Sequence, residues 1–96
     1  MRPSEALRAH REDIRRVVAS HRASNARVFG SVLHENDVEG SDLDLLIDPT
    51  PETTLLDLGG IQADLEDMLG VPVDVLTPGD LPNKYRVQIL REARPL

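Results

Sequence analysis

The pattern of hydrophobic and polar positions divides the chain into helical and extended segments. From Ser4 to about His21, apolar side chains recur on one face while most arginines lie elsewhere, which predicts an amphipathic helix over 4–21. Two short apolar runs, at 26–29 and 43–47, are typical of buried strands. The segment 34–41 between them is polar and rich in turn-forming residues, so we expect a loop there.

The second half of the chain predicts a helix, a strand and a last helix. Thr54-x-x-Asp57 is a capping-box pattern with Asp in place of the usual Glu, and apolar residues follow at helical spacing up to a C-cap at Gly70. The apolar run 71–76 predicts a third strand, and Asp80 is the expected cap of a helix that ends near residue 91.

Two adjacent glycines, Gly59 and Gly60, interrupt the helix that follows Thr54. Each glycine costs ~1 kcal/mol relative to alanine in a helix. Close approach to a neighbouring strand or to a ligand would explain the pair, and so would irregular packing without a function.

The predicted elements follow in the order helix, strand, strand, helix, strand, helix within 96 residues. This length allows one domain with one core, so we expect a single domain over 1–96. The order favours an α/β (α+β) fold in which a small mixed sheet is covered by helices.

Composition excludes several classes of function. The chain has no cysteine, which rules out disulfides, thiolate zinc sites and cysteine nucleophiles. Its two aromatic residues, Phe29 and Tyr85, are too few for a base-stacking platform, and Tyr85 has helical spacing with Leu81 and Ile89, as expected of a core residue. No segment is typical of a signal peptide or a membrane span. We therefore expect a soluble cytoplasmic protein with no membrane contact and no direct nucleic-acid contact.

The net charge of −6 is unevenly distributed. Residues 1–27 hold seven arginines against three acidic residues, whereas residues 28–83 hold thirteen acidic residues and no Lys or Arg. Most of these charges are expected to lie on solvated faces. If the acidic region binds a nucleotide, metal ions must supply the positive charge that its phosphates need.

Three features of the acidic region suggest chemistry. Gly30-Ser31 directly follows a predicted strand, where glycine lets backbone approach a ligand and a following helical turn would aim free N–H groups at an anion. Asp42 and Asp44 alternate with leucines and therefore share one face of a strand, where they can hold hard cations such as Mg²⁺. Taken alone, the first pattern also fits an ordinary turn, and the second a solvent-facing strand edge.

The third feature is Asp74, which lies between two valines of the apolar run 71–76. An unpaired buried carboxylate would cost several kcal/mol, so Asp74 is expected to be paired, metal-bound or poised as a base, unless it lies at an exposed edge.

If the strands 43–47 and 71–76 are neighbours, three carboxylates meet beside a phosphate-binding turn, which is the arrangement of two-metal phosphoryl transfer. Asp42 and Asp44 would hold the cation that binds the triphosphate and bridge to a second one. Asp74 would help to place that second cation and accept the proton of the attacking hydroxyl, while Gly30 and Ser31 bind phosphates.

At these residues the sequence resembles the minimal nucleotidyltransferases of the DNA polymerase β superfamily. The family pattern is Gly-Ser, ten residues, Asp-x-Asp and a third Asp on a later strand, and here it is met by Gly30-Ser31, Asp42-Leu43-Asp44 and Asp74. The resemblance implies a nucleotidyltransferase fold and transfer of AMP from ATP with two Mg²⁺ ions. It also implies an antitoxin role in a stable hetero-oligomer with a HEPN-domain ribonuclease toxin, whose tyrosine is the acceptor.

One position pair departs from the family. Many relatives carry Arg-Gly three and four residues after the serine, where this chain has His34-Glu35. The change removes a phosphate or loop contact and adds negative charge near the site. His34 is either a phosphate contact or proton donor, or a solvent-exposed loop histidine.

Other functions stay open from sequence. A non-catalytic antitoxin would neutralise its toxin by stoichiometric binding, although such a binder has no need of three clustered carboxylates. A transferase acting on a small molecule such as an antibiotic would usually need an added substrate domain. Direct nucleic-acid binding is the function least compatible with the net negative charge and the small number of aromatic residues. Asp48, just before Pro49, is expected to end its strand rather than to serve as a fourth metal ligand.

Overall fold

The computed structural model describes residues 1–96. The helices are α1 (Pro3–Ala9), α2 (Arg11–Ser20), α3 (Leu55–Leu69) and α4 (Arg86–Glu92), with a 3-10 turn η1 (Pro78–Asp80); the strands are β1 (Ala23–Phe29), β2 (Leu43–Pro49), β3 (Val73–Leu76) and β4 (Arg94–Pro95). The strands form one sheet in the order β3-β2-β1-β4. Strand β2 is parallel to β3 and antiparallel to β1, and β4 is antiparallel to β1. The predicted mixed sheet covered by helices is confirmed.

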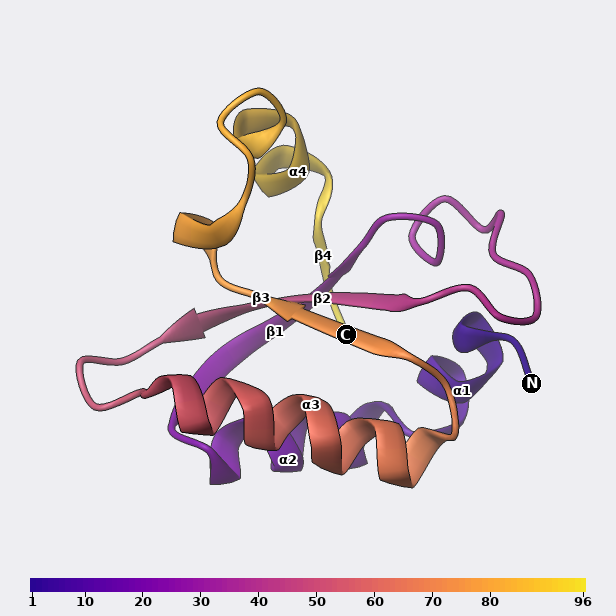
Figure 1. The fold of residues 1–96 in the computed structure, drawn as a ribbon. Helices are drawn as coiled ribbons and strands as arrows, with labels where there is room; N and C mark the ends of the chain where they lie inside the picture. The colour runs from indigo at the N-terminus through magenta and orange to yellow at the C-terminus, as the bar shows by residue number, and fades with distance from the viewer.

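The helices α2 and α3 lie against one face of the sheet, and α4 lies on the other side (Figure 1). Every second residue of β2 faces the helices: Leu43, Leu45 and Ile47 are fully buried, together with Ile14 of α2 and Ile61 and Leu65 of α3. Burying one such side chain stabilises the fold by roughly 1.5–3 kcal/mol. None of the helices is both long and apolar enough to cross a membrane.

The opposite face of the sheet is only partly covered. Phe29 of β1, Leu46 of β2 and Leu81 after η1 form a small apolar cluster there. Asp44 of β2 lies earlier on the same face and is half-buried, and Asp42, just before the strand, is exposed. The segment around Leu81 therefore leaves the end of the sheet near Asp42 and Asp44 accessible.

The predicted helix over 4–21 is two helices. His10 separates α1 from α2 with φ of −131°, outside the helical region. The N-terminus of α1 is held from another part of the chain, because the backbone N–H of Ser4 donates to Oδ2 of the buried Asp37 at 2.9 Å. Apolar periodicity gives no sign of the break at His10, and the prediction of one continuous helix is wrong.

The predicted ends of α3 are confirmed. The backbone N–H of Asp57 donates to Thr54 Oγ1 at 3.2 Å, and the N–H of Thr54 donates back to the Asp57 carboxylate at 2.9 Å. Gly70 caps the other end in the left-handed region, with φ of +69°. A Cβ on Gly60 would lie 2.6 Å from Cε1 of His21, while Gly59 has open space beside it. The close neighbour of Gly60 is thus the side chain that ends α2, rather than a strand or a ligand.

The C-terminal region differs most from the prediction. Asp80 belongs to η1, where it closes a turn capped by Thr77, and α4 begins only at Arg86. Arg86 holds this connection by donating to the carbonyl oxygens of Pro78, Gly79 and Leu81. Tyr85 therefore precedes the helix, so helical spacing does not apply to it, and its exposure of 48% shows that the predicted core position is wrong. The strand β4 was not predicted.

Candidate active site

The sheet brings two of the three predicted carboxylates face to face. Asp44 of β2 and Asp74 of β3 are direct partners in the parallel register. Asp42 lies two positions before Asp44, on the same face, while the intervening Leu43 is buried in the core. The prediction that the strands β2 and β3 are neighbours is therefore confirmed. Asp74 is exposed on the edge strand β3, which is the exposed-edge position that the sequence left open.

Gly30 lies directly against Asp44. It follows Phe29, the β1 partner of Asp44, and has φ of +75°. A Cβ at this position would lie 2.2 Å from Asp44 Oδ2, so the carboxylate or the turn would have to move. Both the left-handed backbone and the close approach thus require glycine here.

A hydrogen-bonded turn over residues 30–35 follows β1. The N–H of His34 donates to the Gly30 carbonyl at 3.3 Å and that of Asn36 to the Ser31 carbonyl at 3.1 Å. The N–H groups of Ser31, Val32 and Leu33 donate to no acceptor within the protein. Free backbone N–H groups on successive residues of a turn are suited to binding an anion. This turn begins beside Asp44, so free backbone donors and a carboxylate lie together.

The carboxylates of the site have no compensating partner. Burial raises the pKa of Asp44 to about 6, and repulsion from Asp74 and then Asp42 adds to the rise. Asp48, by contrast, is bound by Arg27 and accepts a hydrogen bond from Asn25 at 2.8 Å, in agreement with a structural role. An acidic group held without a partner in this way is characteristic of functional sites.

The donor chemistry fits a hard cation. Three carboxylates are the oxygen ligands that Mg²⁺ prefers, and a cation between them would remove the repulsion that raises the pKa of Asp44. As the side chains stand, no three acidic or histidine residues converge closely enough to hold one ion. Asp44 and Asp74 are brought together and Asp42 lies further out, so the metal-ligand roles stay predictions.

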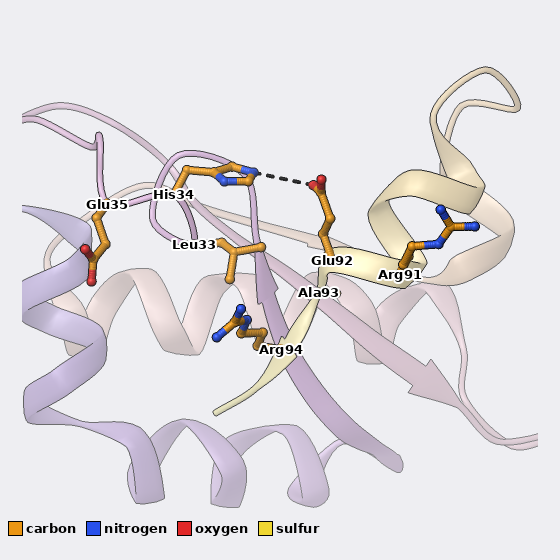
Figure 2. Close-up of a pocket in the computed structure, with 7 residues that line it drawn as sticks. All are labelled: Leu33, His34, Glu35, Arg91, Glu92, Ala93 and Arg94. Carbon is orange, nitrogen blue, oxygen red and sulfur yellow. Dashed lines mark ion pairs between the residues drawn. The ribbon is translucent and has the colours of Figure 1, made fainter.

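The departure from the family pattern at His34-Glu35 has a structural consequence. His34 Nε2 lies 3.5 Å from a carboxylate oxygen of Glu92, which connects the turn to the end of α4 (Figure 2). Glu35 adopts φ of +58°, a conformation that suits the glycine of the family pattern better than a side chain. Leu33, His34 and Glu35 border a cavity of about 630 Å³ that contains none of the three aspartates.

A second cavity, of about 330 Å³, borders Gly30 but, like the first, contains none of the three aspartates. Its lining includes Gly30, His34 and Tyr85. The ring of Tyr85 is half-exposed there, and the Lys84 ammonium lies 5.4 Å from its centroid. Helical spacing predicted a core position for Tyr85, so the sequence did not indicate its place beside Gly30.

Comparisons with known proteins agree with this geometry. Two proteins of Methanocaldococcus jannaschii, both provisionally named as protein adenylyltransferases, are 32% and 35% identical to the chain. The first alignment covers 92% of this chain and 87% of the relative, and the second covers 80% and 83%.

Solved structures share the fold. One that is provisionally identified as a minimal nucleotidyltransferase is 45% identical, with a TM-score of 0.86 over 97% of this chain and 95% of that one. A toxin–antitoxin crystallised with AMP-PNP is 14% identical, with a TM-score of 0.74 over 88% and 69% of the two chains, and this likeness concerns the fold alone. The sequence profile of the nucleotidyltransferase domain matches residues 8–96, and the chain therefore belongs to the nucleotidyltransferase domain family.

Proposed function

We propose that this protein transfers AMP from ATP to a hydroxyl group of another protein in a magnesium-dependent reaction. The observation that carries the proposal is the partnerless Asp44, set between Asp74 and the obligatory glycine at position 30. The names of the M. jannaschii relatives support a protein as acceptor. We further propose that the acceptor is a tyrosine of a cognate HEPN ribonuclease toxin and that the protein acts as its antitoxin in a hetero-oligomer. This function uses ATP, so we expect it to operate in the cytoplasm.

The residues of the site would divide the binding of ATP between them. Asp42, Asp44 and Asp74 would hold two Mg²⁺ ions, which when bound supply the positive charge that a triphosphate needs and that residues 28–83 lack. The free N–H groups of the turn after Gly30 would contact phosphate oxygens. With no side chain at Gly30, the triphosphate can approach the backbone beside Asp44.

The reaction is a displacement at the α-phosphorus of ATP. The acceptor hydroxyl oxygen forms a bond to this phosphorus, the bond to the bridging oxygen breaks, and pyrophosphate leaves. Asp74 is exposed on the edge strand and is the carboxylate that an incoming macromolecule can reach, so it would accept the hydroxyl proton. Positioning and charge neutralisation supply the rate enhancement.

Tyr85 would contact the nucleoside. It borders the same cavity as Gly30, and its half-exposed ring offers a surface on which a base can stack. Base–aromatic stacking contributes about 1–3 kcal/mol and does not depend on the identity of the base. We expect Tyr85→Leu to weaken nucleotide binding by about tenfold and to leave the metal dependence unchanged.

The test uses the product of the neighbouring gene, magnesium and ATP labelled either on the α- or on the γ-phosphate. Transfer of AMP predicts that the partner acquires the α label and not the γ label. The Asp42→Ala/Asp44→Ala variant should lose transfer, whereas the matched variant Asp67→Ala, which removes an exposed and unpaired carboxylate of α3, should retain it. Absence of label on a partner that binds stably would contradict the proposal.

A stoichiometric antitoxin is the second candidate function. The departure at His34-Glu35 and the incomplete convergence of the carboxylates favour it. In that case Asp42→Ala/Asp44→Ala would neutralise the toxin as well as the wild-type protein does. If transfer is the mechanism, the variant should bind the toxin and fail to protect cells from it.

A further inference from the structure

A groove lined by arginines runs beside the phosphate-binding turn. Arg8 and Arg11, at the junction of α1 and α2, and Arg94 of β4 line a cavity of about 260 Å³. Figure 2 shows Arg94 extending from β4 past Leu33, away from Arg91. The acidic residue among the lining side chains is Glu35, so the groove carries a positive balance.

These three arginines make no ion pair in the structure. Four other arginines do, namely Arg2 with Glu5, Arg15 with Glu12, Arg16 with Asp13 and Arg27 with Asp48. The guanidinium groups of the groove are therefore available to an external anion, which they can bind in a bidentate manner.

The groove continues to a buried carboxylate, one oxygen of which lacks a hydrogen-bond donor. A neighbouring cavity of about 270 Å³ shares Ser4, Arg8 and Glu35 with it and ends at Asp37. Asp37 is 3% exposed; its Oδ2 accepts the N–H of Ser4, and its Oδ1 has no partner. A buried unsatisfied acceptor of this kind is stabilised by a ligand that brings an N–H or O–H group.

We propose that this groove binds an acidic peptide segment of the protein that receives AMP, an inference that rests on the proposed function for the identity of its ligand. Carboxylates of the segment pair with Arg8, Arg11 and Arg94, and a backbone N–H donates to Asp37 Oδ1. A DNA backbone matches the arginines but brings no N–H or O–H donor, and the groove offers aliphatic walls and no aromatic ring for the bases of DNA or RNA.

The position of the groove would place a bound peptide segment beside the proposed site of AMP transfer. Val32, Leu33 and Glu35 of the turn after Gly30 form one of its walls. A segment bound there lies against the turn that would hold the triphosphate, so docking orients the acceptor protein relative to the α-phosphate. Such positioning lowers the entropic part of the barrier.

The inference can be tested without the natural partner. The probe is a fluorescein-labelled peptide of ten glutamates, and its anisotropy is followed as the full-length protein is added at low salt. Binding should saturate, weaken at high ionic strength, and fall by about tenfold in Arg8→Ala/Arg11→Ala/Arg94→Ala. The matched variant Arg15→Ala/Arg16→Ala/Arg22→Ala carries the same loss of charge elsewhere and should bind like the wild type.

Two further measurements separate the alternatives. Asp37→Asn replaces the free acceptor with a donor at equal size but also removes a negative charge, so the lost hydrogen bond should weaken peptide binding several-fold at high ionic strength, where salt screens the charge effect. A melting curve confirms folding. Asp42→Ala/Asp44→Ala should bind the peptide normally, so failure of AMP transfer leaves this result intact. Equal loss in both arginine variants, or tighter binding of a ten-nucleotide oligothymidine than of the peptide, would overturn the inference.

Discussion

Asp44 illustrates how a functional side chain can lower the stability of the fold that presents it. Its carboxylate is partly buried beside two others and has no basic partner, and its pKa is raised from the usual 3.8 to about 6. Between these two pH values the folded protein keeps a proton that the unfolded chain releases. Folding stability therefore decreases as pH rises through this range, and the decrease is complete near neutral pH.

Replacing Asp44 by asparagine should remove this cost. Asn cannot ionise, so without added metal we expect Asp44→Asn to raise the free energy of unfolding at pH 7 by about 1–2 kcal/mol, a value discounted for partial exposure. This corresponds to a rise of roughly 4–10 °C in melting temperature for a domain of this size. Thermal unfolding at pH 7 and at pH 4 checks the sign, because the gain should be absent at pH 4. Equal melting temperatures at pH 7 would contradict the electrostatic argument.

Gly30 should tolerate no side chain. In Gly30→Ala the new Cβ would meet Asp44 Oδ2 at 2.2 Å in a left-handed backbone, so the turn and the carboxylate must move apart. We expect a loss of about 1–3 kcal/mol in unfolding free energy and loss of transferase activity. Chemical denaturation and the labelling assay measure the two effects. A variant that is as stable and as active as the wild type would show that the close contact is not needed.

Replacing Glu35 by glycine should stabilise the protein, in contrast to the loss of stability expected of Gly30→Ala. Its φ of +58° lies in the left-handed region, which costs a non-glycine residue roughly 1 kcal/mol. We expect Glu35→Gly to stabilise the protein by up to about 1 kcal/mol and, by removing a negative charge from the arginine groove, to tighten binding of the glutamate peptide. Unfolding and anisotropy measurements test both parts, and a destabilised variant would indicate that Glu35 makes a contact that outweighs its backbone strain.

At the scale of elements, sequence patterns predicted the features that depend on residues close together in the chain. Period-2 alternation placed Asp42 and Asp44 on one face, and the capping residues Thr54 and Gly70 fixed both ends of α3. The register that sets Asp44 opposite Asp74 depends on strand pairing between distant segments, which periodicity does not encode. The strand β4 also depends on a long-range contact, its pairing with β1.

The glycine pair in α3 offers a matched test within one element. Gly59 has open space where a Cβ would lie, so Gly59→Ala should stabilise the protein by about 0.5–1 kcal/mol through helix propensity. Gly60→Ala should lack this gain, because its Cβ would meet the ring of His21, which contacts Asp64 at 2.7 Å. Denaturant titration of the two variants measures the difference, and equal stabilisation by both would show that His21 moves away without cost.

At the scale of the whole molecule, the main hydrophobic core and the candidate active site lie on opposite faces of the sheet. The core lies between the sheet and the helices α2 and α3, while the opposite face leaves the starts of β2 and β3 accessible (Figure 1). The sequence indicated the site carboxylates because they lie close together along strands. It did not indicate the arginine groove, because Arg8 and Arg11 meet Arg94 only when the two ends of the chain come together.

The central claim is that the carboxylates around Asp44 bind a nucleotide together with a cation. Calorimetric titration of a non-hydrolysable ATP analogue with Mg²⁺ into the wild type, Asp44→Asn and Asp67→Asn tests it most directly. We expect the wild type and Asp67→Asn to bind equally and only when Mg²⁺ is present, and Asp44→Asn to bind at least about tenfold more weakly. Because Asp44→Asn is expected to be the more stable protein, unfolding would not explain its loss of binding. Unchanged affinity in Asp44→Asn, or equal binding without Mg²⁺, would contradict the account.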